Sequence, residues 1–314
     1  MNAKTEIASY RHERLSKINL AHLDILYEAV YNKPRHHNYF LKKYNTAYTG
    51  NGYIGFIAYN DQQPVAYYGV VPCFIKYNEE MILAAQSVDT MTHPAYRYQG
   101  LFVQLAERTF DLCRMEGINL IFGFPNQNSL KGFMKLGWQT TEVMNNYEIP
   151  VTGISLENMA RQIPFVLKLY SSWQQHVLKK YLLPQKGVEG SVINDGFAGI
   201  HRDQQYLDYK TYNDTRVIRI GRSLLWIKIK NGLIIGDMNC LAGDFDDTIF
   251  ALKKLASKLG LRQIQFQTCK HTGLAALFAK RYMATPAFHV IIKDLGTSIP
   301  LDKIKFTFAD VDIF

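Results

Sequence analysis

The segment from Arg97 to Phe102, with the sequence RYQGLF, has the composition of a loop that binds an anion. A strand is expected before it, over residues 81–91, and a helix after it, over residues 101–115. Successive backbone N–H groups of such a loop and the positive end of the helix dipole converge on one point. Gly100 lets a phosphate approach the backbone because it has no side chain. We therefore expect this loop to bind a pyrophosphate group.

A second pattern follows the helix, and it is independent of the loop. An apolar strand is expected over residues 118–126, where it ends in Asn126. A short helix is expected over residues 129–136, and the pair Gly137-Trp138 ends it. This part of the chain therefore has a defined order: a helix, a strand, an Asn, a short helix and a Gly-aromatic pair. The order supports the interpretation of the loop as an anion-binding site.

Together the two patterns resemble the GCN5-related N-acetyltransferases, the GNAT family. The phosphate loop of that family, Gln/Arg-x-x-Gly-x-Gly/Ala, is similar to residues 97–102, apart from Phe102 in place of a small residue. Asn126 and Gly137-Trp138 match the family's downstream Asn and Gly-aromatic pair. The resemblance covers residues 10–150 and implies that acetyl-CoA binds between two diverging central strands. The cofactor contacts that it implies are Met91, Arg97, Tyr98, Gln99, Gly100, Leu101, Phe102, Asn126, Ser129 and Phe133.

One residue departs from the chemistry that the resemblance implies. Many GNAT enzymes have a Tyr seven residues after that Asn, and this Tyr protonates the leaving thiolate. Phe133 stands at the position in this chain, and a phenyl ring has no proton to donate. Either another group serves as the acid, with Tyr98 and Tyr147 as candidates, or the thiolate leaves unassisted.

The second half of the chain is expected to repeat the element order of the first. Strands are expected over residues 215–220, 224–229, 233–240, 263–269 and 287–293, and helices are expected over residues 246–259 and 271–281. The resemblance therefore implies a tandem GNAT arrangement. It consists of a GNAT-like acyl-CoA-binding domain over residues 1–150, a helical bridging segment over 151–186, and a second GNAT-like half over 187–314. The expected fold class is mixed α/β, with mostly antiparallel central sheets flanked by helices.

The second half lacks the phosphate loop. At the entry of its first long helix stand Asp244, Asp246 and Asp247, which would repel a pyrophosphate and cap the helix instead. We expect a degenerate second copy that shapes the acceptor pocket or supports the fold. In the bridging segment a helix is expected over residues 156–183, and its expected buried residues are Ile163, Val166, Leu167, Leu169 and Val177.

Composition limits the other classes of function. The 314 residues carry a net charge of +9, but the Lys and Arg residues are dispersed and form no run typical of a nucleic-acid-binding tail. The N-terminus has no apolar signal region, and no apolar run is long enough to span a membrane. The four cysteines are far apart and form no metal-binding pattern. We expect a cytoplasmic protein with no metal, no membrane partner and no nucleic-acid partner.

Acyl transfer to an amine needs a base, because an alkyl amine is mostly protonated at neutral pH. Asp89 is one candidate, since its strand would run beside the acyl group, and a structural hydrogen bond is the alternative role. His93 is a second candidate, with loop shaping before Pro94 as the alternative. The C-terminal carboxylate of Phe314 is a third, on a tail expected to form a strand over 306–314, with plain packing as the alternative.

On this interpretation the protein is an acyl-CoA-dependent N-acyltransferase, with acetyl-CoA as the expected co-substrate. The acceptor is expected to be the amine of a small molecule, such as an amino sugar or an amino acid, and transfer is direct within a ternary complex. Asp310 and Asp312 share one face of the expected C-terminal strand and can hold a cationic amine there. Two alternatives remain: a Fem-like transferase that uses aminoacyl-tRNA, and a non-catalytic acyl-CoA-binding or sensor protein, which Phe133 favours.

Overall fold

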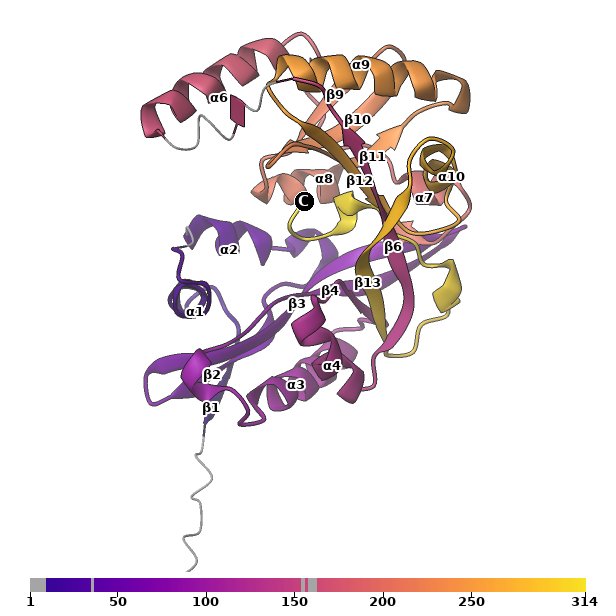
Figure 1. Cartoon of the computed structure of the whole chain (residues 1–314). Helices are drawn as coiled ribbons and strands as arrows, with labels where there is room; N and C mark the ends of the chain where they lie inside the picture. The colour runs from indigo at the N-terminus through magenta and orange to yellow at the C-terminus, as the bar shows by residue number, and fades with distance from the viewer. Residues whose placement is uncertain (1–9, 35–36, 154–155, 158–162) are drawn as a thin grey trace, which may run out of the picture.

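One mixed β-sheet of 13 strands runs through the part of the chain that the structure describes (Figure 1). The structure is a computed structural model, and it describes residues 10–34, 37–153, 156–157 and 163–314. Neighbouring strands are antiparallel apart from two parallel pairs, which are β4 (Glu80–Thr92) with β5 (Leu120–Gly123) and β11 (Leu233–Asn239) with β12 (Gln263–Thr268). The expected α/β class and the mostly antiparallel pairing are confirmed, with one continuous sheet in place of separate ones.

The first half, up to residue 150, follows the expected order with small differences at the ends of elements. Its other strands are β1 (Arg11–Arg14), β2 (Ile54–Asn60), β3 (Gln63–Tyr77) and β6 (Gln139–Pro150). Its helices are α1 (Ala21–Tyr31), α2 (His37–Lys43), α3 (Leu101–Met115) and α4 (Gln127–Lys135), with the short 3-10 helices η1 (Ala47–Thr49) and η2 (Pro94–Tyr96). Helix α3 has the expected bounds, whereas β5 is shorter than the expected strand over 118–126.

The later part of the chain contributes the other elements of the same sheet. Its strands are β7 (Leu182–Leu183), β8 (Gly199–Ile200), β9 (Arg216–Ile220), β10 (Ser223–Ile229), β11, β12 and β13 (Ala284–Asp294). Its helices are α6 (Pro164–Leu178), α7 (Ser191–Asn194), α8 (Gln204–Tyr209), α9 (Phe245–Lys258) and α10 (Gly273–Ala279). The 3-10 helices are η3 (Lys210–Tyr212), η4 (Ala242–Asp244), η5 (Leu301–Lys303) and η6 (Phe308–Asp310).

The two halves of the sheet are joined because each half contributes one strand to the other. β13, from the end of the chain, lies between β5 and β6, and β6 in turn lies between β13 and β12. Ile291 of β13 pairs with Gly123, and Ile264 of β12 pairs with Ile149. Because each half borrows a central strand from the other, the hydrogen-bonded ladder does not break between them.

The two faces of the first half carry different helices. The α3 face of the sheet buries alternate residues of β3 and β4, among them Tyr68 and Ala85, against Leu101 and Leu105. The opposite face packs against α1 and α2 (Figure 1). This alternation of side chains between faces is the period of two that a β-strand imposes, and it puts neighbouring residues of β4 on opposite sides of the sheet.

The expected burial of the bridging helix is wrong for four residues. Ile163, Val166, Leu167 and Leu169 are between 38% and 56% exposed, although Val177 is buried as expected. The cause is that α6 contacts the rest of the molecule mainly through its later turns. The Tyr170 hydroxyl donates to the carbonyl of Leu259 at 2.7 Å, and Val177 and Leu178 belong to the core. The helix also ends at Leu178, before the expected residue 183, and residues 158–162 of the expected helix lie outside the described residues.

The expected C-terminal strand over residues 306–314 is also wrong. A single bridge joins Thr307 to Thr268, and the chain then turns into η6. Thr307 and Asp310 form a capping box that satisfies the first N–H groups of this turn. The alternating apolar residues of the tail are buried all the same, because the turn lies inside the molecule, next to β11 and β12.

Candidate functional site

The central opening of the sheet lies between β4 and β5. The two strands pair over three positions only, and the last pair is Gln86 with Phe122. Beyond it, Gly123 pairs with Ile291 of β13, while β4 continues along β3 as far as Thr92. Two parallel strands that stop pairing with each other leave backbone groups free at the carboxyl end of the shorter one, which is where ligands bind in open α/β sheets.

A β-bulge lies in β4 next to this opening. Val88 pairs with Gly69 and Met91 with Tyr67, so Asp89 and Thr90 together stand opposite Tyr68 alone. Asp89 adopts a left-handed backbone conformation with φ of 50°. A bulge leaves the backbone groups of its extra residue outside the ladder, and such an N–H group can bind an oxyanion.

The loop before α3 has the geometry of an anion-binding site. Tyr98 and Gly100 both have a positive φ, of 64° and 77°, and Gly100 is the N-cap residue of α3. The first N–H groups of an α-helix have no partner inside the helix. A Cβ atom built on Gly100 would meet only the Gln104 amide nitrogen, at 3.5 Å. The surface in front of these N–H groups is therefore open to a phosphate.

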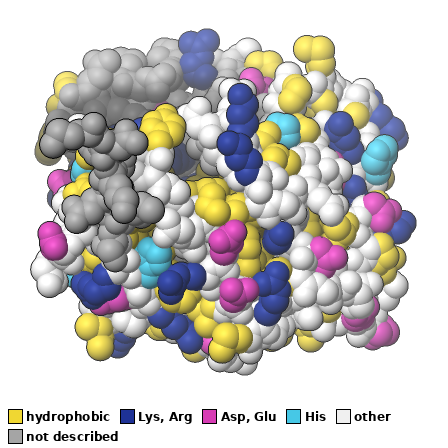
Figure 2. Space-filling model, turned by 90° about the horizontal axis from the view of Figure 1, so that it is seen from below, with side chains coloured by type: hydrophobic (Ala, Val, Ile, Leu, Met, Phe, Trp, Pro, Cys, Tyr) yellow, Lys and Arg dark blue, Asp and Glu magenta, His cyan; other side chains and the backbone are white. Residues whose placement is uncertain are grey.

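The predicted contact residues of this loop divide into two groups. Arg97, Tyr98 and Gln99 are exposed, and the Gln99 side chain accepts a hydrogen bond from Tyr10. Leu101 and Met91 are buried in the core, so only their backbone can reach a ligand. Figure 2 views the molecule from below, the side of α3 and α4 in Figure 1, and shows Lys and Arg side chains interspersed with Asp and Glu.

Phe102 turns away from the loop. Its ring fills the space between α3 and α4, where it contacts the Phe133 ring with centroids 5.4 Å apart and would lie 3.2 Å from a Cβ atom on Gly132. The side chain that replaces the family's small residue therefore packs the two helices together, without covering the N–H groups at the start of α3.

The start of α4 is built by Asn126, which caps the helix. Its side-chain oxygen accepts from the N–H groups of Asn128 and Ser129, each at 3.0 Å, and the Ser129 hydroxyl donates back to Asn126. Asn126 itself is exposed beside the opening. Phe133, further along α4, is buried against the ring of Trp138.

Tyr68 is a residue that the sequence-based reasoning missed. Its ring contacts Phe133 with centroids 6.3 Å apart, and its hydroxyl accepts a hydrogen bond from Ser87 Oγ at 3.2 Å. Ser87 directly follows the last residue of β4 that pairs with β5. Burial raises the pKa of Tyr68 well above its usual value, although the bond from Ser87 lowers it. The phenol therefore stays protonated, in a fully buried position beside Ser87.

The opposite face of the bulge carries a pair of carboxylates around a buried lysine. Lys43 Nζ lies 2.7 Å from Asp89 and 2.6 Å from Asp312, and the Tyr44 hydroxyl donates to Asp89 at 2.8 Å. Lys43 is fully buried, whereas the two carboxylates are 13% and 18% exposed. The three charged side chains sum to a formal charge of −1, and the charge of the buried Lys210 also acts on Asp312. The two acids are the members that face solvent, which favours a cationic ligand there.

Lys43 and Asp312 hold each other in the ionised form. Burial alone would lower the pKa of Lys43, but the carboxylates of Asp312 and Asp89 raise it well above its usual value. Burial would likewise raise the pKa of Asp312, and Lys43 outweighs it, so that the pKa lies below its usual value. Tyr31 stands near both carboxylates, and burial followed by the charge of Asp89 raises the pKa of its hydroxyl.

The three candidates for the base lie apart. Asp89 is held by Lys43 and Tyr44 at the bulge. His93 Nδ1 accepts from the N–H of Ala95 at 3.2 Å, so its ring caps η2 and shapes the loop. The Phe314 ring is buried against Trp226 of β10, with centroids 5.4 Å apart. Asp89 lies at the bulge next to the β4–β5 opening.

The second parallel pair repeats this geometry, but the C-terminal tail fills it. β11 and β12 pair over three positions, and Gly236 is an extra residue between the pairs Asp237–Trp226 and Ile235–Ile227. A Cβ atom on Gly236 would lie 2.2 Å from the Phe314 ring. The last residue of the chain therefore occupies the surface of this second opening.

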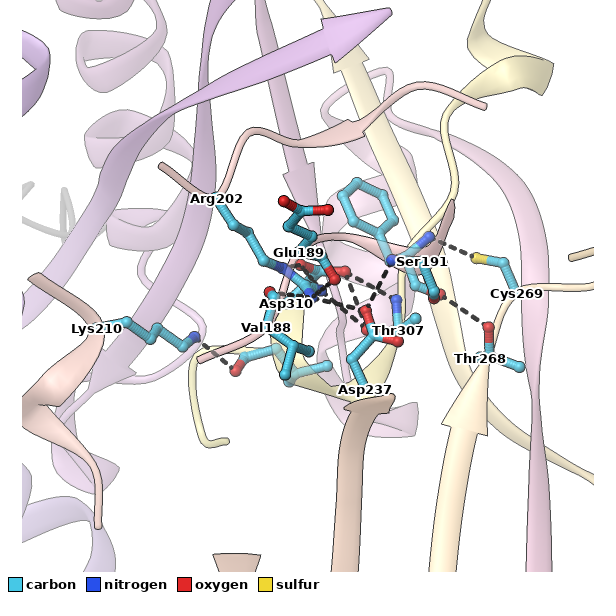
Figure 3. A network of polar contacts seen from close by, with 12 residues as sticks. Val188, Glu189, Ser191, Arg202, Lys210, Asp237, Thr268, Cys269, Thr307 and Asp310 are labelled. Carbon is cyan, nitrogen blue, oxygen red and sulfur yellow. Dashed lines mark hydrogen bonds and ion pairs between the residues drawn. The ribbon is translucent and has the colours of Figure 1, made fainter. Parts of the chain in front are cut away.

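Buried charges hold the tail in place (Figure 3). Arg202 lies 2.6 Å from Asp237 of β11 and 2.7 Å from Asp310 of η6, and it donates to Thr307 at 3.0 Å. All three charged side chains are at most 1% exposed. Burial raises the pKa of Asp237, while Arg202 opposes this effect. The sequence predicted that the Asp310 carboxylate can bind a cationic amine. In the structure this carboxylate already binds the guanidinium of Arg202.

The described residues contain neither a metal-binding cluster nor a helix suited to span a membrane. No group of three or more His, Cys, Asp and Glu side chains there has a metal-binding arrangement. None of the described helices combines the length and the apolar composition needed to cross a membrane.

Comparison with known proteins is consistent with this geometry. Residues 22–141 match the family described as the acetyltransferase (GNAT) domain. A protein of Enterococcus faecalis V583 described as a probable N-acyltransferase shares the fold, with a TM-score of 0.59, 14% identity, and coverage of 92% of this chain and 73% of that one. A GCN5-related N-acetyltransferase from Kribbella flavida has a TM-score of 0.60 and 8% identity, with coverage of 92% and 72%.

A GCN5-related N-acetyltransferase from Anabaena variabilis ATCC 29413 has a TM-score of 0.55 and 13% identity, with coverage of 91% of this chain and 73% of that one. At identities this low the structural likeness shows the fold alone. No curated protein sequence matches the chain. The loop, the opening between two parallel strands and the family match agree: residues 22–141 match the acetyltransferase domain of the GNAT family.

Proposed function

We propose that the protein transfers an acyl group, with acetyl-CoA as the expected donor, to the amine of a small cationic molecule. One observation carries the proposal: the β4–β5 opening has an anion-binding loop on one face of the sheet and the partly exposed carboxylates of Asp89 and Asp312 on the other. The two faces suit a polyanionic donor and a cationic acceptor, and the opening lets them meet in line.

The residues of the first face fit the donor. The diphosphate of CoA would lie on the N–H groups at the start of α3, next to Gly100 and the exposed Arg97. Asn126 stands exposed at the start of α4, on the other side of the opening. When bound, acyl-CoA supplies an activated thioester carbonyl. The N–H groups at the bulge of Asp89 and Thr90 are the donors placed to bind its oxygen.

Each polar group around the opening then has a role in the transfer. Tyr68 gives its phenol proton to the departing thiolate sulfur, since Ser87 already donates to its oxygen and leaves that proton free. Asp312 and Asp89 bind the ammonium group of the acceptor. Asp89 takes the proton of that group, directly or through a water molecule, before attack. The second half, which we infer to be a degenerate copy of the first, supports the acceptor side through its tail.

The proposal is tested by measuring thiol release from acetyl-CoA with a panel of amines. We expect turnover with small molecules that carry two or more amino groups, such as amino sugars and diamines, and little with acidic amino acids. A chain that acetyl-CoA stabilises but that releases no thiol with any amine would support a binding or sensor role. Transfer from aminoacyl-tRNA without any from acyl-CoA would favour a Fem-like enzyme.

The role of Tyr68 predicts a specific loss in a conservative variant. Tyr68→Phe removes only the hydroxyl, and we expect kcat to fall about a hundredfold, at the lower end of the range for general acid–base catalysis. The stabilisation of the fold by acetyl-CoA should be unchanged, because the phosphate loop is intact.

A second variant separates chemistry from packing. Tyr68→Phe combined with Phe133→Tyr restores a hydroxyl in the same aromatic group, from α4 in place of β3. Partial recovery of kcat in this double variant is the expected result. A single Tyr68→Phe variant with the kcat of the unchanged protein would exclude Tyr68 as the proton donor.

Asp89 and Asp312 are expected to respond differently to substitution by asparagine. Asp89→Asn should lower kcat about a hundredfold, and the loss should shrink as pH rises, because more of the acceptor arrives as the neutral amine. Asp312→Asn should leave kcat unchanged and raise KM for a diamine about tenfold, the factor that 1.4 kcal/mol represents. Equal pH profiles for the unchanged protein and Asp89→Asn would rule out Asp89 as the base.

A further inference from the structure

Helices α6 and α9 lie on the outer side of the second half (Figure 1). Exposed side chains of α6 and of the end of α9 form a basic and apolar surface there. We define this α6–α9 surface by its apolar side chains Phe165, Leu169, Trp173 and Phe250 and its lysines Lys168, Lys179, Lys180, Lys253, Lys254 and Lys258. It lies apart from the β4–β5 opening, and the proposed function makes no use of it.

The apolar part of the surface is a stripe along one face of α6. Phe165, Leu169 and Trp173 are spaced by four residues, and they are 70%, 56% and 36% exposed. The part of the helix that packs adjoins this stripe: Val177 lies one turn after Trp173 and is buried, and the Trp173 and Tyr170 rings contact each other with centroids 6.0 Å apart. The stripe thus runs from the packed end of α6 out to Phe165 and Leu169, which are more than half exposed. The core does not account for two large apolar side chains in this position.

The charge of the surface has one sign. Residues 163–185 contain three lysines and no Asp or Glu, and residues 248–261 contain three lysines and no Asp or Glu. Among the described residues, no carboxylate forms an ion pair with any of the six lysines of the surface. The underside of the molecule in Figure 2, by contrast, mixes both signs.

The two helices form one continuous surface. The Tyr170 hydroxyl binds the Leu259 carbonyl at 2.7 Å, which fixes α6 against the end of α9. Lys258 lines a shallow hollow with Trp173 and Lys180, and it also lines a second hollow with Phe250 and Lys254. Aromatic rings and lysines therefore alternate across both helices, and Lys254 lies over the Phe250 ring at 4.2 Å.

We propose that the α6–α9 surface binds the surface of an anionic phospholipid membrane. Lipid fits better than nucleic acid because phosphates alone would not use Phe165 and Leu169, whereas aliphatic and aromatic side chains enter the boundary between head groups and acyl chains. The lysines then lie at the level of the anionic head groups. A surface contact needs no membrane-spanning segment, so the composition that excludes a span does not exclude this contact.

The test uses the full chain and vesicles of phosphatidylcholine with or without phosphatidylglycerol, at low and high salt. We expect binding to the anionic vesicles that high salt weakens, and little binding to neutral ones. Trp173 supplies a second readout, because Trp138 and Trp226 are buried: its fluorescence should shift to shorter wavelength on binding.

Variants then locate the contact. Lys253→Gln with Lys254→Gln should weaken binding about thirtyfold, the factor that corresponds to about 1 kcal/mol for each lysine at an anionic surface. Phe165→Ser with Leu169→Ser should abolish the fluorescence shift. The matched control, Lys17→Gln with Lys280→Gln, makes the same charge change at exposed lysines elsewhere and should bind as the unchanged protein does.

Several outcomes would overturn the proposal. They are equal binding by the control and the surface variants, binding that does not depend on phosphatidylglycerol, and binding of tRNA in place of vesicles. A dimer in solution that Phe165→Ser with Leu169→Ser converts to a monomer would assign the surface to a second copy of the chain. None of these measurements depends on acyl transfer, so they are independent of the proposed function.

Discussion

Gly100→Asp is expected to abolish the binding of acetyl-CoA and with it all turnover. The substitution places a carboxylate in front of the N–H groups at the start of α3, where the proposed diphosphate lies, and like charges repel. In the unchanged protein, acetyl-CoA at 100 times its dissociation constant should raise the free energy of unfolding by about 2.7 kcal/mol. Thermal unfolding with and without acetyl-CoA measures this gain, which should vanish in the variant.

The chain offers a matched control at the other end of the same helix. Gly117 has φ of 76°, close to the 77° of Gly100, and no atom lies within 4 Å of a Cβ atom built on it. Gly117→Asp therefore introduces the same side chain in the same backbone conformation, away from the loop. Without ligand, Gly117→Asp should lose more stability, because its carboxylate lies at the negative end of the helix dipole, but only Gly117→Asp should still be stabilised by acetyl-CoA. Equal stabilisation of both would refute the assignment of the loop.

Arg202→Ala is expected to lower the free energy of unfolding by about 3–5 kcal/mol, because removal of one partner leaves buried charges uncompensated. Asp237 and Asp310 would face each other without a cation, and they are at most 1% exposed. This loss is a large part of the about 5–15 kcal/mol by which domains are usually stable. Denaturant unfolding measures it, and the tail that fills the β11–β12 opening should become accessible to carboxypeptidase.

A surface ion pair gives the comparison for this prediction. Arg222 binds Asp244 with two hydrogen bonds, as Arg202 binds Asp310, but its side chain is 75% exposed. Solvent screens such a pair, so Arg222→Ala should cost at most about 1 kcal/mol. If Arg202→Ala cost no more than Arg222→Ala, the network in Figure 3 would not be what holds the tail.

The sequence by itself determined the elements whose signals are local. Helix α3 was predicted to the residue, since its apolar residues recur at helical spacing and Gly100 marks its start. The GNAT domain was likewise predicted from short patterns around Gly100 and Asn126, and the α/β class was predicted from the order of the expected strands and helices. Such patterns are readable because the left-handed conformation of a glycine and the period of a helix depend on a few neighbouring residues.

Only the tertiary structure decided what the candidate site contains. Lys43 and Asp312 are 269 positions apart, and Tyr68 reaches Ser87 from the neighbouring strand, so no local pattern could pair them. The exchange of β6 and β13 and the burial of the tail depend on contacts between the two halves, which also made the expected C-terminal strand and the expected burial of α6 wrong. Apolar periodicity shows which face of an element can be buried, but whether another element covers that face depends on how the whole chain packs.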